Sequence, residues 1–170
     1  MRKLVSIAVT AGVLSVAGCG GSDSSSATVK WADGVCSAVV DYKNSLKDAA
    51  SSVQSSPSKQ SLDKAVKSVQ SATTTFVDKL DGLGQPDTKA AASAKQTLKD
   101  LSSELTKDAN AIAAAGSESP LNLVSAVSTT LLSAQSQIKA AVTELKQLDA
   151  KGELHDAFSQ ASSCDSLTGK

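Results

Sequence analysis

The sequence predicts an all-α fold: an antiparallel up-down-up-down four-helix bundle with a short C-terminal fifth helix and one disulfide. In four long segments, apolar residues recur at steps of three and four, which is the spacing of one face of a helix. Short segments rich in Ser, Pro and Gly separate these four segments, and short connections favour antiparallel neighbours. Aromatic residues are scarce, whereas Ala, Ser, Leu, Val and Lys dominate, which also favours helices.

The first helix is expected at about residues 29–53. Its apolar stripe consists of Trp31, Val35, Val39 (or Ala38), Tyr42, Leu46, Ala49 and Val53. The second helix is expected to start at Ser56 and Pro57, a pair typical of an N-cap and the first helical position, and to end at Asp81-Gly82. Its stripe consists of Leu62, Val66, Val69, Thr73, Phe76 and Leu80.

The third helix is expected to follow Asp87 or Thr88, either of which is a suitable N-cap, and to end at Gly116. Its stripe consists of Ala91, Ala94, Leu98, Leu101, Leu105 and Ile112, with Asp108 or Ala109 filling the gap.

The fourth helix is expected to start at Ser119-Pro120 and to end at Lys151-Gly152. Its apolar residues occupy heptad a and d positions over nearly four heptads: Val124, Val127, Leu131, Ala134, Ile138, Ala141, Leu145 and Leu148. A short fifth helix is expected to carry Leu154, Phe158 and Ala161 on one face, with Cys164 close to its end.

The N-terminal residues have the layout of a secretory signal peptide. Arg2 and Lys3 form a short positive segment, and an uncharged apolar run follows at residues 4–17. This run is too short for a comfortable membrane span, which takes about 20 apolar residues. We therefore expect residues 1–18 to be a leader that is removed.

The leader ends in the motif Val16-Ala17-Gly18-Cys19, which resembles the lipobox of bacterial lipoproteins at each position. The resemblance implies transfer of a diacylglyceryl group to the Cys19 thiol and cleavage between Gly18 and Cys19. The alternatives are a plain signal peptide with a chance cysteine and an uncleaved anchor.

Two acyl chains on Cys19 would hold the protein stably at the cell membrane, on its extracytoplasmic face, whereas one chain binds reversibly. Residues 20–27 are rich in Gly and Ser and are expected to form a flexible tether. The expected organisation is a leader (1–18), a lipidated cysteine with its tether (19–28) and a helical bundle domain (29–170).

With Cys19 assigned to lipid, two of the three cysteines remain, Cys36 and Cys164. Two cysteines in an exported protein indicate one disulfide, and the alternative is two free, buried thiols. The topology favours the bridge, because the fourth helix returns to the end at which the first one starts. Closing so long a loop would stabilise the fold by roughly 4–5 kcal/mol on the chain-entropy argument.

The charge balance argues against nucleic acid as a partner. The chain has 17 Lys and Arg residues and 17 Asp and Glu residues, so it is formally neutral. Loss of Arg2 and Lys3 with the leader would leave a net charge near minus two and no arginine. The lysines are interspersed with acidic residues, whereas a nucleic-acid surface is typically a basic cluster.

A second resemblance covers most of the mature chain. The segment Trp31-Ala32-Asp33-Gly34-Val35-Cys36, the loop at residues 80–88 and the late Cys164 look like a group of small helical actinobacterial lipoproteins and secreted proteins. The W-A-x-x-V-C start is its most specific part. The resemblance implies a helical fold and an extracytoplasmic location, and it implies no activity and no site residue.

The sequence contains no convincing catalytic constellation, so we expect no enzyme, cofactor or metal. His155 is the only histidine, and it is expected on a solvent-facing side of a helix beside Glu153 and Asp156. Ser61 and Lys64 match an S-x-x-K spacing by chance, with Lys64 facing water. Asp81 and Asp87 flank a Gly-rich loop whose spacing does not fit a calcium site.

Trp31 is the one ambiguous residue. It is expected to be a core aromatic that covers the Cys36 disulfide, and the alternative is a ligand groove or a membrane interface. The expected function is a non-catalytic interaction or scaffold module of the cell envelope, bound to the membrane through the lipid on Cys19. The alternative function is a carrier of a small molecule or lipid in an apolar cavity between the helices. The partner would be an unknown envelope protein or a small apolar ligand.

Overall fold

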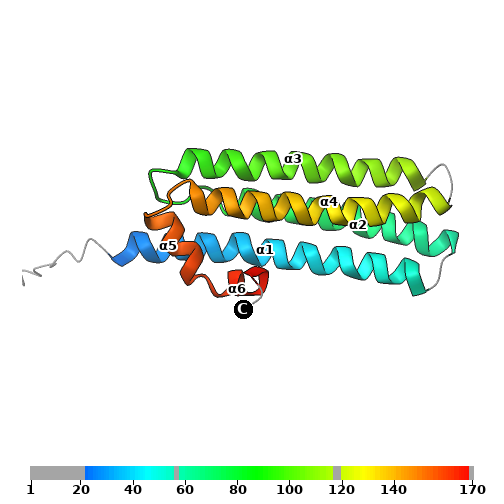
Figure 1. The fold of residues 1–170 in the computed structure, drawn as a ribbon, viewed down its shortest axis with the longest axis horizontal. Coiled ribbons are helices and arrows are strands. Elements are labelled where there is room, and N and C mark those ends of the chain that lie inside the picture. The colour runs from blue at the N-terminus through cyan, green and yellow to red at the C-terminus, as the bar shows by residue number, and fades with distance from the viewer. Residues whose placement is uncertain (1–21, 56–57, 117–119, 169–170) are drawn as a thin grey trace, which may run out of the picture.

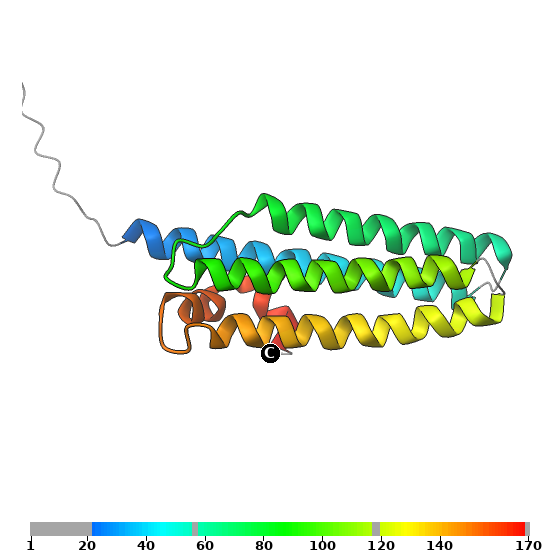
Figure 2. The same cartoon turned by 90° about the horizontal axis from the view of Figure 1, so that it is seen from above.

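The computed structural model describes residues 22–55, 58–116 and 120–168, and every regular element in these ranges is a helix. The four long helices α1 (Ser22–Ser55), α2 (Lys59–Gly82), α3 (Ala91–Gly116) and α4 (Pro120–Gln147) lie side by side, and consecutive helices run in opposite directions (Figures 1 and 2). Two short helices, α5 (Glu153–Gln160) and α6 (Ser162–Thr168), pack against α1 near the end where it begins. The predicted all-α helical bundle is confirmed.

The core consists mainly of the predicted apolar stripes, although the predicted residues Val66, Ala91, Leu131 and Leu148 are only partly buried. All seven predicted residues of α1 are buried, as are Leu98, Leu101, Leu105 and Ile112 of α3 and Ala134, Ile138, Ala141 and Leu145 of α4. In α3 the gap in the stripe is filled by Ala109, which is 4% exposed. Because periodicity depends only on local sequence, it located these faces correctly. The side chain of Val124 lies outside the described residues.

The first helix begins earlier than expected. The segment from residue 22 to residue 28 was expected to belong to the flexible tether, but it is the start of α1. Thr28 is fully buried, and Trp31 is 5% exposed. Because packing fixes this turn, each preceding residue extends an existing helix, which costs far less than starting one. The expectation of a tether is therefore wrong for residues 22–28.

The described cap of α2 is Ser58. Its hydroxyl accepts a hydrogen bond from the Ser61 N–H at 3.2 Å, and the Ser61 hydroxyl accepts one from the Ser58 N–H at 2.9 Å. This reciprocal pair is a capping box, with Ser61 in the position usually held by Glu or Gln. The expected cap, Ser56 with Pro57, lies outside the described residues. The predicted end of α2 at Gly82 is confirmed.

The start of α3 differs from the prediction. The helix begins at Ala91, and Thr88 contributes its carbonyl oxygen, which accepts a hydrogen bond from the Ala91 N–H at 3.1 Å. The Thr88 hydroxyl is buried without a hydrogen-bond partner among the described residues, and Asp87 is exposed. A side-chain cap from Thr88 is therefore wrong. The predicted end at Gly116 is confirmed.

The C-terminal part forms two short helices instead of one. Pro120 is the first residue of α4 as predicted, Ser119 lies outside the described residues, and α4 ends at Gln147, one turn before Lys151. Leu154, Phe158 and Ala161 are buried as expected. At Ala161 the backbone is extended (φ −73°, ψ 113°), and this break turns the chain toward α1.

The long helices do not pack equally closely. α1 packs most extensively on α2, and α4 packs most extensively on α3. Contacts between α1 and α4 are sparser. The seam between α1 and α4 is therefore an open side of the bundle.

Candidate functional site

Cys36 and Cys164 form a disulfide, as predicted. Their Cα atoms lie 5.0 Å apart, although 128 positions separate the residues in the sequence. Both residues are buried, at 0% and 3% exposure. The bridge fastens α6 to α1 and thereby closes almost the whole described chain into one loop.

Trp31, five residues before Cys36 on α1, is a core residue. Its ring packs edge-to-face on Phe158 of α5, with the centroids 6.0 Å apart, and its Nε1–H donates to the Gly84 carbonyl oxygen at 3.3 Å. The indole therefore joins α1 to α5 and to the α2–α3 loop. Gly84 has φ +67°, a conformation that favours glycine. At 5% exposure Trp31 is a core aromatic, as predicted, and its ring is not accessible to a ligand groove or a membrane surface.

Sequence reasoning assigned no role to Asp33, which caps α6. Its Oδ1 accepts a hydrogen bond from the Ser163 N–H at 2.8 Å and one from the Ser162 hydroxyl at 3.4 Å. The Ser163 N–H holds the pKa of Asp33 below its ordinary value, because it stabilises the carboxylate, whereas partial burial opposes this effect. No pattern reveals a cap for a helix so far away in the sequence.

Gly34 also had no assigned role. An added Cβ at this position would lie 2.5 Å from Leu83 Cδ2, so Leu83 could not keep its place against any larger residue. Trp31, Asp33, Gly34 and Cys36 thus each contact the α2–α3 loop or the C-terminal helices. The W-A-x-x-V-C segment of α1 therefore contacts the elements that meet at one end of the bundle, the end that the disulfide closes.

The structure does not bring together the residues that were considered as candidates for catalysis or metal binding. His155 is half-buried, and its Nδ1 lies 3.4 Å from the Lys146 carbonyl oxygen. A carbonyl only accepts, so Nδ1 is the donor in this contact. His155, expected on a solvent-facing side of its helix, is only partly exposed, because its ring contacts the end of α4. Lys64 is exposed as expected, and within the described ranges no group of three His, Cys, Asp or Glu residues is placed to hold a metal ion.

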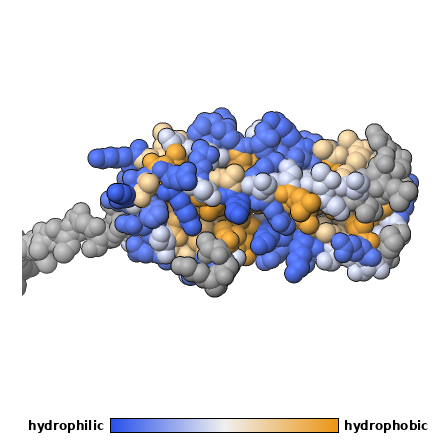
Figure 3. All heavy atoms as spheres, in the orientation of Figure 1, coloured by the Kyte–Doolittle hydropathy of each residue, from blue (hydrophilic) through white to orange (hydrophobic). Residues whose placement is uncertain are grey.

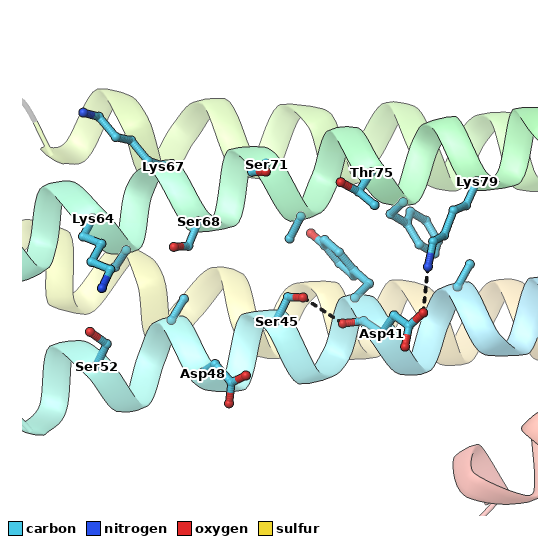
Figure 4. Close-up of a pocket in the computed structure, with 16 residues that line it drawn as sticks. Asp41, Ser45, Asp48, Ser52, Lys64, Lys67, Ser68, Ser71, Thr75 and Lys79 are labelled. Carbon is cyan, nitrogen blue, oxygen red and sulfur yellow. Dashed lines mark hydrogen bonds and ion pairs between the residues drawn. The ribbon is translucent and has the colours of Figure 1, made fainter.

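A groove of about 630 Å³ lies between α1 and α2 (Figure 4). Short side chains such as Ala38, Ala49 and Ala72 line the seam and leave this hollow, which Phe76 also lines. Its mouth mixes both signs of charge, and Asp41 and Lys79 form an exposed ion pair of 2.7 Å across it. The hollow follows from the small residues at the seam, and it carries no nucleophile paired with a base.

A second groove of about 690 Å³ lies between α1 and α4, where Leu167 of α6 also contributes. Its apolar lining includes Val39, Leu46, Leu131, Ile138 and Val142, and its charged lining residues are lysines. Figure 3 shows apolar side chains between polar ones on the face that includes α4. Leu132, which also lines this groove, is the one large apolar residue among the described residues that is mostly exposed, at 68%. We call this hollow the α1/α4 groove.

The described part of the chain is thus a helical-bundle protein closed by one disulfide, with an apolar groove on one side. A scan against models of protein families, a search of curated proteins and a search of solved structures each found no match. Among the described helices, none is long and apolar enough to span a membrane. Residues Val16 to Cys19, which resemble a lipobox, lie outside the described residues.

Proposed function

We propose that this protein is a lipid-anchored helical bundle on the extracytoplasmic face of the cell membrane, where it acts without catalysis as an interaction or scaffold module of the envelope. The observation that carries the interaction role is the α1/α4 groove with its exposed Leu132. Isolated exposed apolar residues are common on proteins, but one at the edge of an apolar groove is typical of a binding surface.

The anchor rests on the leader motif that ends in Cys19, and the disulfide is consistent with it. Disulfides persist in oxidising compartments outside the cytoplasm. α6, which carries Cys164, packs against α1 near the end where α1 begins, so a lipid on Cys19 would bring this end close to the membrane. The open groove lies along the side of the bundle, where a neighbouring protein could reach it.

The carrier alternative has weaker support. It calls for an enclosed apolar cavity beside Trp31, whereas Trp31 packs on Phe158 and lines neither groove. The α1/α4 groove is open along the surface, so a bound lipid would leave much of its length in water. A partner with a broad apolar face fits this surface better than an enclosed small molecule.

The anchor is tested by labelling cells with a clickable fatty acid. The wild-type protein should take up the label and remain with the membrane fraction, whereas Cys19→Ala should do neither, because the thiol is the acylated atom. A variant with Cys36→Ser and Cys164→Ser is the matched control, since it loses the two disulfide-bonded cysteines but keeps Cys19. Unchanged labelling of Cys19→Ala would contradict the anchor.

The absence of catalysis is tested at the only histidine. His155→Gln keeps a polar side chain on α5 that can contact the end of α4, and it should leave any cellular phenotype of the protein unchanged. Loss of the phenotype in a variant with an unchanged melting curve would show that the imidazole has a chemical role.

A further inference from the structure

The α1/α4 groove differs from the rest of the surface in its charge. Lys43 of α1 and Lys139 and Lys146 of α4 line it, and its lining residues include no Asp or Glu. The α1/α2 groove, by contrast, has Asp41 and Asp48 among its lysines, and Lys79 is paired with Asp41. The α1/α4 groove is thus lined by three positive charges and no negative one, whereas the α1/α2 groove is lined by three positive and two negative charges.

We propose that the α1/α4 groove binds an acidic amphipathic helix of a partner protein. This inference rests on the proposed interaction role and names the chemistry of the partner. The apolar face of such a helix would cover the groove, and its Glu or Asp residues would pair with the lysines at the walls. A docked helix would cover the seam between α1 and α4, where these long helices pack less closely than α1 with α2 or α3 with α4.

The spacing along α4 fits a partner helix. Leu131, Gln135, Ile138, Val142 and Lys146 line the groove at steps of three and four residues. From Leu131 to Lys146 the helix rises about 22 Å, which corresponds to about four turns of a partner lying along it. Apolar anchors at the same steps on the partner would meet this row as helices do in a bundle.

The exposure of Leu132 distinguishes a helix from a single acyl chain as the ligand of the α1/α4 groove. The side chain stands at the groove edge with 68% of its surface exposed. An acyl chain on the floor of the groove would leave the outer side of Leu132 in water. A helix with its side chains is about 10 Å wide, so it covers floor and edge together. The exposed position of Leu132 therefore favours the helix.

The test uses the protein as the cell processes it, reconstituted in phosphatidylcholine nanodiscs, with empty nanodiscs as the background. The probe is a fluorescent peptide of about four helical turns, with Leu on one face and Glu beside it. A second peptide carries Lys in place of Glu. We expect saturable binding of the acidic peptide by fluorescence anisotropy, no saturable binding of the basic one, and weaker binding at high salt.

Matched variants locate the binding. A triple variant should bind the acidic peptide about tenfold more weakly, because three surface charge pairs are lost. It carries Lys43→Gln, Lys139→Gln and Lys146→Gln. The control replaces Lys59, Lys95 and Lys99 by Gln, which changes the net charge equally on other surfaces and should change the affinity less than twofold. Leu132→Ser should also weaken binding, whereas Ala140→Ser, an exposed position on the same helix, should not. Hydrogen exchange should slow in residues 39–46 and 131–146 on binding.

Several outcomes would overturn the proposal. Equal binding of both peptides, or equal affinity of the two triple-lysine variants, would show that the groove does not select an acidic helix. Displacement of the peptide by palmitate at lower concentration would identify a lipid site, and dimerisation sensitive to Leu132→Ser would identify a second copy as the occupant. If Cys19 carries no lipid, the titration is run in buffer, so failure of the anchor and failure of the groove are distinguished.

Discussion

The Asp33 carboxylate accepts a hydrogen bond of 2.8 Å from the backbone N–H of Ser163, a residue 130 positions further along the chain. This contact lies three residues before Cys36 on α1 and one residue before Cys164 on α6. The side chain of one helix thus caps the first turn of another, immediately beside the disulfide that joins them. The same six-residue segment supplies a ring contact, a close glycine contact and the disulfide itself.

Asp33→Ala should lower the free energy of unfolding at neutral pH by about 1 kcal/mol, as loss of an N-cap commonly does. Asp33→Asn is the matched control, because the amide oxygen still accepts a hydrogen bond while the charge is lost, so its effect should be smaller. Urea denaturation monitored by circular dichroism measures both. Equal effects of the two substitutions would show that the charge, and not the cap, is what matters.

The charge of Asp33 gives its contribution a pH dependence. The Ser163 N–H lowers the pKa of Asp33 from its ordinary value of 3.8, so the folded state holds the proton more weakly than the unfolded state. The stabilisation is therefore complete above 3.8 and is lost as the pH falls through the lower pKa of the folded state. Wild type and Asp33→Asn should accordingly become more similar in stability toward acid pH. A stability difference that grows toward acid would contradict the sign of this pKa shift.

Replacing both Cys36 and Cys164 by Ser should lower the free energy of unfolding by about 2–5 kcal/mol, because the long loop is no longer closed in the unfolded chain. Mass spectrometry of the unreduced wild-type protein should detect the Cys36–Cys164 peptide. The helical circular dichroism signal of the variant should persist in the cold, since the four long helices still bury their apolar faces. Free thiols at both positions in exported wild-type protein would contradict the bridge.

Gly34 and Leu83 should show energetic coupling. Gly34→Ala gains up to about 1 kcal/mol of helix propensity, but the new Cβ displaces the end of Leu83. In a Leu83→Ala background that displacement is absent, so Gly34→Ala should be more favourable there by about 1 kcal/mol. Gly34→Ala with Leu62→Ala, a buried residue near the opposite end of α2, is the control pair and should be additive. Additivity in both pairs would contradict the close contact.

Tyr42 is the only tyrosine, so tyrosinate absorbance reports on it alone. Burial raises the pKa of Tyr42 above 10.0; the hydrogen bond with Thr73 opposes this shift, and the negative charge of Asp108 adds to it. The folded state therefore keeps its proton longer than the unfolded state, and stability is full below pH 10.0 and falls as the pH rises above it.

Alkaline titration of the folded protein should thus have its midpoint above 10.0, and Thr73→Val should move it further upward by removing the opposing hydrogen bond. Asp108→Asn should move the midpoint down. A midpoint at 10.0 in protein that remains folded by circular dichroism would show that the phenol is not buried.

Local sequence was sufficient for the helices and their buried faces. The stripe of α1 from Trp31 to Val53 is buried throughout, and the ends of α2 and α3 at Gly82 and Gly116 were predicted correctly. These features depend on residues three or four positions apart, whose relation is the same in any helix. The cysteine count and the expected topology also identified the disulfide.

Tertiary structure decided what depends on residues far apart in the chain. Four such features occur at the end of the bundle that the disulfide closes. They are the early start of α1, the break at Ala161, the cap from Asp33, and the packing of Trp31 against Phe158 and the Gly84 carbonyl. The α1/α4 groove likewise depends on how loosely two helices from opposite halves of the chain pack. Helical periodicity predicts which face of a helix is apolar. How closely a neighbouring helix approaches that face depends on the side chains of both helices.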